Sequence, residues 1–388
     1  MIPVIRPLLG PEEAEAAAQA ISSGWIAQGP RVAEFEAAFA AATGTGHAVA
    51  VSSCTAALHL AMIVAGVGRG DEVVAPSMSF IATANAARYV GARVVFADVE
   101  PDTLNLTVET VAPLLTDRTR AVILVDQAGV PADLDAMREL CDPRGIAVIE
   151  DAACAAGSTY RGRPAGAGAA LAAFSFHPRK LLTTGEGGMI TTPDPDVAAR
   201  LRRLREHGMN VSAAARHVEQ RVVIERYDEV GYNYRMTDIQ AAIGLVQLGR
   251  LDEIIERRRE LAQRYQCLLS QISGLRTISD PSFGLTNFQS FWVALPADFP
   301  VARNDLLQML ADAGISSRRG IMAAHLEPAY ANLVRDVQLP VTERLSASTL
   351  IIPLFHQLTA AEQNRVVDVI SAASEKAAVL PDPAKLPA

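Results

Sequence analysis

Short apolar segments alternate with segments of helical periodicity over the first 150 residues of this 388-residue chain. We expect strands at 48–51, 72–75, 93–97, 121–125 and 146–150, and helices at 11–21, 31–42, 55–65, 80–89, 108–115 and 133–141. Strands separated by helices are joined by right-handed crossovers, which make neighbouring strands parallel. The alternation therefore predicts an α/β fold whose mainly parallel, mixed sheet is covered by helices on both faces.

The second half of the chain has fewer strand signals. A long helix is expected from Met236 to about Leu269, then a strand at 291–295 and helices at 303–313 and 359–373. We place a domain boundary inside the long helix. This predicts a large domain at 1–250, which includes the N-terminal arm, and a smaller C-terminal α+β domain at 251–388. The last nine residues, LPDPAKLPA, are expected to be disordered.

Composition argues against several classes of function. The chain has 35 basic and 43 acidic residues, a formal charge of −8, and no Lys/Arg run, so no nucleic-acid surface is expected. Its four cysteines, Cys54, Cys141, Cys154 and Cys267, are widely spaced, which argues against a metal site or a disulfide framework. Neither a signal peptide nor an apolar run of about 18 residues is present, so we expect a cytoplasmic protein without a membrane span.

Lys180 lies in the stretch AAFSFHPRKLLTTGEGGMITT, residues 172–192, between two short strands and beside a turn of small residues. A lysine amine can form a Schiff base when burial or a neighbouring charge lowers its pKa. From this stretch alone, a solvated lysine on a loop is an equally good interpretation.

Asp151 follows the strand at 146–150 directly. Ligands of parallel α/β sheets bind at the carboxyl ends of the strands, so this carboxylate faces the expected site. It could be a helix N-cap, or one half of a structural ion pair with Lys180. It could also be the carboxylate that keeps the ring nitrogen of pyridoxal phosphate (PLP) protonated while a lysine holds the cofactor.

Three further segments have both a structural and a functional interpretation. Ser53-Cys54-Thr55-Ala56-Ala57 begins a helix, where free N–H groups could bind a phosphate or Ser53 or Thr55 could simply cap the helix. Phe80 follows another strand and could stack on a cofactor ring or belong to the core. Asn233, before the long helix, could reach a ligand or belong to a capping loop.

The order of these segments resembles the layout of fold-type I PLP enzymes, and it closely resembles the DegT-like sugar aminotransferases. The resemblance is carried by SGWxxxGP at 23–30, APS at 75–77, DVxP at 98–101, EDAA at 150–153, SFHPxK at 175–180, GxNxRM at 231–236 and HxxPxY at 325–330. It implies a PLP-dependent aminotransferase with an amino-acid donor, expected to be L-glutamate. The implied acceptor is a keto-sugar, expected on a nucleotide, or alternatively a ketocyclitol or another cyclic ketone.

The same resemblance implies roles for single residues. Lys180 would hold PLP and move the proton, and Asp151 would pair with the ring nitrogen. Phosphate contacts would come from Cys54, Thr55, Ala56 and Ser175, and Phe80 would stack on the ring. Asn233 would reach the site of a neighbouring subunit, which implies a homodimer with shared active sites. Five residues would line the substrate pocket: Trp25, Gly29, Arg318, Arg319 and His325.

Three positions depart from the family pattern. Cys54 stands where the family commonly has glycine. Cys154 stands where a glutamine contacts the phenolic oxygen of the cofactor, and because cysteine is a weak donor we expect this contact to be lost or replaced by water. Residues 315–322 lack a tyrosine-bearing pattern, and their adjacent arginines could bind a phosphate or a donor carboxylate, or be solvated. A sugar dehydratase is disfavoured because such relatives replace the lysine, and a non-catalytic sensor is disfavoured by the intact Asp151–Lys180 pair.

Overall fold

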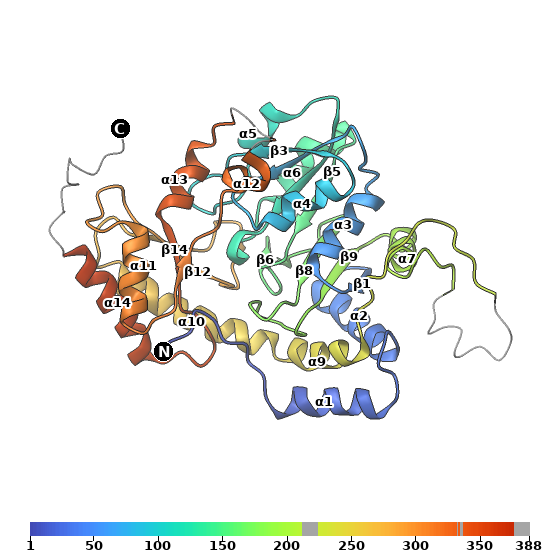
Figure 1. The fold of residues 1–388 in the computed structure, drawn as a ribbon, viewed down its shortest axis with the longest axis horizontal. Coiled ribbons are helices and arrows are strands. Elements are labelled where there is room, and N and C mark those ends of the chain that lie inside the picture. Colours follow the sequence, from blue (N-terminus) through green and yellow to red (C-terminus); the bar gives the residue numbers. More distant parts are fainter. Residues whose placement is uncertain (212–223, 332, 334–336, 376–388) are drawn as a thin grey trace.

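A computed structural model describes residues 1–211, 224–331, 333 and 337–375, so the tail expected to be disordered lies outside the described residues. At its centre is a seven-stranded sheet of order β1-β9-β8-β5-β4-β2-β3 (Figure 1). Its strands are β1 (His47–Val51), β2 (Glu72–Pro76), β3 (Arg93–Ala97), β4 (Thr119–Val125), β5 (Ala147–Asp151), β8 (Leu171–Ser175) and β9 (Gly188–Thr192). β9 is antiparallel to both of its neighbours, and the other six strands run in one direction. The predicted α/β fold with a mainly parallel, mixed sheet is confirmed.

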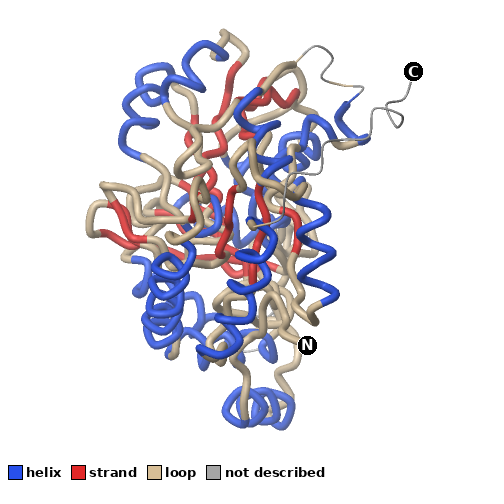
Figure 2. The backbone as a smooth tube through the Cα atoms, turned by 90° about the vertical axis from the view of Figure 1, so that its left-hand side faces the viewer, coloured by secondary structure: helices blue, strands red, loops and turns tan. Residues whose placement is uncertain are grey.

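Alternate residues of each strand enter two separate cores. On β4, Val122 and Leu124 pack into one core, and Ile123 and Val125 pack into the other. Helices lie on both sides of the strands (Figure 2). The helices are α1 (Pro11–Ser22), α2 (Pro30–Thr43), α3 (Cys54–Val64), α4 (Ile81–Tyr89), α5 (Val108–Val111), α6 (Leu134–Cys141), α7 (Pro195–Leu204), α9 (Asp238–Gly249), α10 (Leu251–Leu269), α11 (Arg303–Asp312), α12 (Pro328–Ala331), α13 (Pro340–Ser348) and α14 (Ala360–Ser374). Four 3-10 turns are η1 (Ala112–Leu114), η2 (Gln127–Gly129), η3 (Asp142–Arg144) and η4 (Ala324–Leu326).

The C-terminal part contains an antiparallel sheet of order β10-β12-β14-β13, beside which α11 and α14 lie (Figure 1). Its strands are β10 (Arg276–Thr277), β12 (Phe291–Ala294), β13 (Arg318–Arg319) and β14 (Thr349–Ile352). A third, small sheet has the order β11-β6-β7, formed by β6 (Thr159–Tyr160), β7 (Arg163–Pro164) and β11 (Gly284–Leu285). The N-terminus joins the C-terminal part, because Ile2 pairs in a parallel bridge with Ile315. The division near residue 250 stays a prediction.

The long helix expected from Met236 to Leu269 is two helices. α9 ends at Gly249 and α10 begins at Leu251, and between them Arg250 has φ −104° and ψ 0°. The guanidinium of Arg250 forms ion pairs with Glu12 and with Glu13, at 2.9 Å from the latter. Arg250 therefore ties the junction to α1, which lies along α9 (Figure 1).

Three other differences have local causes. The helix expected at 108–115 stops as α5 at Val111, because Pro113 has no N–H to continue it, and a 3-10 turn follows. α7 was not predicted, although Asp194 caps it by accepting from the N–H groups of Asp196 and Val197. α13 was also not predicted, and it starts with Pro340 in its first turn.

Candidate active site

The predicted catalytic residues meet at the carboxyl edge of the large sheet. β5 ends at Asp151 and β8 ends at Ser175, and the two strands are parallel neighbours. β1, which runs in the same direction, leads through Ser53 into the N-terminus of α3. The strand ends therefore bring Asp151, the start of α3 and the turn that carries Lys180 to one edge, as the sequence predicts.

Lys180 is held in place by a turn and by the packing before it. Its N–H donates to His177 O at 2.8 Å, and Pro178 occupies the second position of this turn, where a fixed φ is favourable. Phe174 and Phe176 are fully buried against the aromatic rings of α2. Because strand residues alternate between faces, this packing directs Ser175 to the opposite side.

The Lys180 amine contacts a thiol. Nζ of Lys180 donates a hydrogen bond to Sγ of Cys154 at 3.0 Å. Cys154, where we expected a contact with the cofactor to be lost, therefore accepts a hydrogen bond from the lysine itself. Nothing in the spacing of 26 residues between the two side chains indicates this contact.

The charge on Lys180 depends on its neighbours as well as on its burial. Burial lowers the pKa of Lys180, but Cys154, Cys54 and Asp151 together outweigh it, and the net pKa lies above the ordinary value. The amine is therefore protonated at neutral pH.

Asp151 is a buried carboxylate with a partner on each oxygen. Its Oδ2 accepts from Thr83 Oγ1 at 2.8 Å and its Oδ1 accepts from the N–H of Ala153 at 3.3 Å, and the residue is 3% exposed. Burial raises the pKa of Asp151, while Thr83, Lys180 and the Ala153 N–H act in the opposite direction. We did not single out Thr83 from the sequence. It lies in the first turn of α4, directly after the strand end that drew attention to Phe80.

The N-terminus of α3 has the shape of an anion site. Ser53 Oγ accepts from the N–H of Ala56 at 3.1 Å, so the contact expected from the Ala56 N–H is already used for capping. The N–H groups of Cys54 and Thr55 belong to the same first turn, at the positive end of the helix dipole. A Cβ on Gly188 would lie 2.5 Å from Ser53 C and 2.6 Å from Cys54 N, so the TTGEGG turn approaches this turn too closely for any side chain.

Phe80, predicted to stack on the cofactor ring, and Asn233, predicted to reach the site of a neighbouring subunit, both face outwards. Phe80 caps α4 and is 66% exposed. Asn233 is exposed and forms an isolated bridge with Glu206 rather than a contact with Lys180.

The predicted substrate loop is fixed by a carboxylate that we did not predict. Asp238 Oδ1 accepts from the N–H of Gly29 at 2.7 Å and from that of Val32 at 3.0 Å. The Trp25 ring lies against Gly29, because a Cβ on this glycine would come within 2.6 Å of the indole. The TD pair before α9 resembles an ordinary cap, so nothing local shows that Asp238 reaches α2.

Arg318 and Arg319 point in opposite directions, as successive strand residues must. Arg319 is exposed and forms an ion pair with Glu327 at 3.0 Å. Arg318 lies on the side of Cys154 and Arg179, and its Nη2 donates a hydrogen bond to Ser290 Oγ at 3.4 Å. Its Nε is buried without a partner among the described residues.

His325 does not present a free ring to a substrate. It is 4% exposed, Nδ1 lies 2.6 Å from Ser77 Oγ, and Nε2 lies 3.3 Å from Glu343 Oε1. Ser77 also accepts from the N–H of His325 at 3.0 Å. His325 therefore anchors the loop that leads to Phe80.

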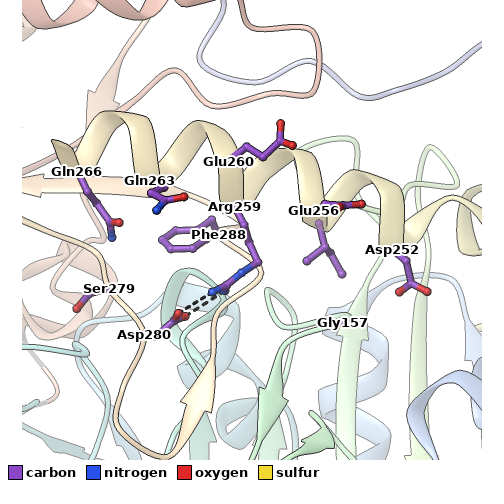
Figure 3. Close-up of a pocket in the computed structure, with 11 residues that line it drawn as sticks. Gly157, Asp252, Glu256, Arg259, Glu260, Gln263, Gln266, Ser279, Asp280 and Phe288 are labelled. Carbon is purple, nitrogen blue, oxygen red and sulfur yellow. Dashed lines mark hydrogen bonds and ion pairs between the residues drawn. The ribbon is translucent and has the colours of Figure 1, made fainter. Parts of the chain in front are cut away.

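A cavity of about 810 Å³ lies away from this edge, along α10 (Figure 3). Arg259 crosses it to form an ion pair with Asp280 at 2.7 Å, and Glu256 and Glu260 line it. Neither Lys180 nor Asp151 lines this cavity, so it is not the site that the motifs define.

Within the described ranges, no three His, Cys, Asp or Glu side chains are grouped so that they could hold a metal ion. In the same part of the chain, every helix is too short or too polar to cross a bilayer.

The fold and this site define an α/β enzyme with a lysine amine and a buried carboxylate at one sheet edge. The chain belongs to the DegT/DnrJ/EryC1/StrS aminotransferase family, whose model matches residues 7–371. This family is PLP-dependent, and the residues at the edge fit the cofactor: Asp151 is a buried carboxylate, and Gly188 lets the chain pack without a side chain against the first turn of α3.

Solved structures agree over almost the whole chain. The aminotransferase TlmJ from Streptoalloteichus hindustanus is 39% identical, with a TM-score of 0.88 over 96% of this chain and 98% of that one. The sugar aminotransferase CalS13 from Micromonospora echinospora is 31% identical, with a TM-score of 0.86 over 96% and 100%. Spr1654 from Streptococcus pneumoniae, described as a sugar aminotransferase and solved in a PMP-form, is 28% identical, with a TM-score of 0.91 over 97% and 99%.

Proposed function

We propose that this aminotransferase moves an amino group from L-glutamate to the ketone of a sugar, carried on a nucleotide. One observation carries the proposal: a buried carboxylate, Asp151, and a lysine amine, Lys180, lie within electrostatic reach of each other at a sheet edge that also contains the N-terminus of α3. The likeness to CalS13 supports a sugar as the acceptor. A ketocyclitol or another cyclic ketone is the alternative acceptor, and the cytoplasmic location remains a prediction.

PLP, when bound, supplies an electron sink for the bond changes at the substrate carbon. Lys180 would hold it, and Asp151 would keep its ring nitrogen protonated. The N–H groups of Cys54 and Thr55, with the Ser175 hydroxyl, would donate to its phosphate, and Phe80 would cover its ring. Lys180 Nζ then takes and returns the proton, for which it must lose the charge that its neighbours favour in the free chain.

Arg318 is the candidate for an anionic group of a substrate. A partly buried guanidinium without a carboxylate partner retains much of its capacity for charged hydrogen bonds. It lies near Cys154, and therefore near the lysine. The carboxylate of the donor is the anion that this position favours, and Arg319, already paired with Glu327, is left outside the pocket.

We also propose a homodimer in which Asn233 completes the neighbouring site. Asn233 lies at the surface, and the chain before it exposes Ile224 (82%), Tyr227 (61%) and Val230 (86%). Exposed apolar side chains of this size are typical of contact surfaces. Sedimentation should give twice the mass of one chain.

The function is tested in two half-reactions. L-glutamate added to the PLP-loaded enzyme should bleach the cofactor band and release one equivalent of 2-oxoglutarate per site, whereas D-glutamate should not. The resulting amino form is then mixed with a panel of nucleotide-linked keto-sugars and ketocyclitols, and the band should return with the true acceptor. If L-glutamate leaves the band unchanged, the donor assignment is wrong, and if no ketone restores it, the acceptor class is wrong.

A further inference from the structure

A second acidic group lies behind Asp151, on the opposite face of the sheet. Asp126 follows β4 directly, and Glu150 precedes Asp151 on β5. Both are buried, at 1% and 4% exposure. Successive strand residues face opposite sides, so Glu150 and Asp151 project to different faces.

Each of the two carboxyl groups has one oxygen bound to a backbone N–H. Asp126 Oδ1 accepts from Ala132 N at 2.9 Å, and Glu150 Oε1 accepts from Gly166 N at 3.1 Å. The other two oxygens, Asp126 Oδ2 and Glu150 Oε2, are buried and have no donor among the described residues. β4 and β5 pair Leu124 with Glu150, so Asp126, two residues after Leu124, lies beside Glu150 on the same face, and the two carboxyl groups interact.

A proton shared between the two carboxyl groups would give their unpaired oxygens a hydrogen bond. Two buried carboxylates would repel each other and leave two oxygens without a donor, which is costly. One shared proton gives the missing hydrogen bond and reduces the charge of the pair to −1. Burial and Glu150 both raise the pKa of Asp126, and burial raises that of Glu150, in agreement with this arrangement.

The pair also holds the backbone around the proposed cofactor residues. The N–H of Asp126 donates to Asp151 O at 3.2 Å, and the Asp126–Ala132 bond closes the loop at 126–132. Gly129 in this loop packs against Asn287, whose Nδ2 donates to Cys154 O at 2.8 Å. The loop at 126–132 therefore contacts both ends of the segment 151–154, Asp151 directly and Cys154 through Asn287.

We propose that Asp126 and Glu150 are positioning residues that share one buried proton, hold the segment 151–154 in place, and limit the charge behind Asp151 to one unit. The effect on Asp151 rests on the proposed function, whereas the shared proton does not. The charged groups that face the pair are its own two members and Asp151, which Lys180 faces in turn.

Infrared spectra of the cofactor-free chain test the shared proton. At pH 7 the wild-type chain should show a protonated-carboxyl band that is lost in both Asp126→Asn and Glu150→Gln. In each variant the introduced amide N–H donates to the remaining carboxylate, which then needs no proton. Asp98→Asn is the matched control, since the oxygens of Asp98 already accept from Val341, Thr342 and its own neighbour Val99. An unchanged band in Asp126→Asn and Glu150→Gln would overturn the proposal.

Stability against pH gives a second readout. The folded pair keeps a proton that the unfolded chain releases above about pH 4, so stability should fall as the pH rises from 5 to 8. The urea midpoint of the wild-type chain should fall over this range, and that of Asp126→Asn/Glu150→Gln should fall less. Equal slopes would contradict the shared proton even if the band assignment were disputed.

The positioning role is tested by rescue. In Asp126→Ala the pH midpoint of the bound-PLP absorbance should shift, and Asp126→Asn should restore it because the amide can still donate to Glu150. A merely structural role would change PLP affinity without moving this midpoint. If the proposed function fails, PLP does not bind or react, whereas the infrared band still decides the shared proton.

Discussion

The amine of Lys180 donates a hydrogen bond to the thiol sulfur of Cys154, at 3.0 Å. Cys154 heads the neighbours that raise the pKa of Lys180 against the effect of burial. Removing this thiol by Cys154→Ala should therefore lower the pKa of Lys180 and make the free amine available at lower pH. PLP should then bind to the cofactor-free chain with a pH profile shifted to lower pH, as measured by absorbance.

Cys267→Ala is the control for this shift, because Cys267 is an exposed cysteine on α10. Its pH profile should match that of the wild type. If the pH profile of Cys154→Ala coincides with those of the wild type and of Cys267→Ala, the thiol of Cys154 does not control the charge of Lys180.

Lys180→Ala and Lys180→Arg should abolish transamination, because neither side chain offers a neutral primary amine at working pH. The measurement is 2-oxoglutarate formed from L-glutamate in a single turnover, with circular dichroism to establish that the variants are folded. Wild-type turnover in either variant would remove Lys180 from its proposed role.

Gly188→Ala should weaken PLP binding, because its Cβ would fall 2.5–2.6 Å from the Ser53–Cys54 backbone. The backbone must move, at a cost of about 1–3 kcal/mol in stability. Gly249→Ala is the control, since a Cβ there meets nothing within 4 Å. PLP affinity, measured by titration, and the urea midpoint should both be lower for Gly188→Ala than for Gly249→Ala. Similar PLP affinities for the two would mean that this edge does not hold the phosphate.

The sequence predicts the residues that follow strand ends better than those whose role depends on long-range contacts. Asp151 was found because it comes at the end of a buried strand, and Ser175, also at a strand end, was assigned through the family resemblance. Asp126 satisfies the same rule after β4, and it was missed only because no family motif covers it. Thr83 and Asp238 could not be identified, since the partner of each lies at least 68 residues away in the chain.

The adjacent arginines show a different limit. A sequence cannot assign inward and outward faces to a strand of only two residues, and β13 consists of Arg318 and Arg319 alone. Their directions are set by pairing with Leu350 and Ile351 of β14. Likewise, burial argues for a lowered pKa at Lys180, but only the fold reveals the thiols that reverse this effect.

The pKa of Glu72 predicts an acid-sensitive part of the sheet. Glu72 begins β2, is 1% exposed, and accepts from Thr116 and from the exposed Arg93 and Arg118. Although burial acts to raise it, these partners lower the pKa of Glu72 to about 2. The stabilisation is therefore present above the unfolded pKa of about 4.5 and is lost as the pH falls towards 2. Glu72→Gln should be less stable than the wild type at pH 7, and the difference should shrink on acidification in urea unfolding.

Arg318 and Arg319 provide a matched pair for the donor site. Arg318→Ala removes a guanidinium that has no acidic partner in the part of the chain that the structure describes, whereas Arg319→Ala removes one that is already paired with Glu327 on the surface. A charged hydrogen bond to a carboxylate contributes about 1.5–3 kcal/mol, so Arg318→Ala should weaken L-glutamate binding about tenfold or more.

The measurement is the concentration of L-glutamate that half-saturates the first half-reaction, followed through the cofactor band. Arg319→Ala should stay within about twofold of the wild type, because an exposed ion pair contributes little. L-Alanine keeps the α-carboxylate and lacks the distal one, so an equal loss with both donors would place Arg318 at the α-carboxylate. A loss with L-glutamate alone would place it at the distal carboxylate. If neither donor is affected in Arg318→Ala, its guanidinium does not bind the donor.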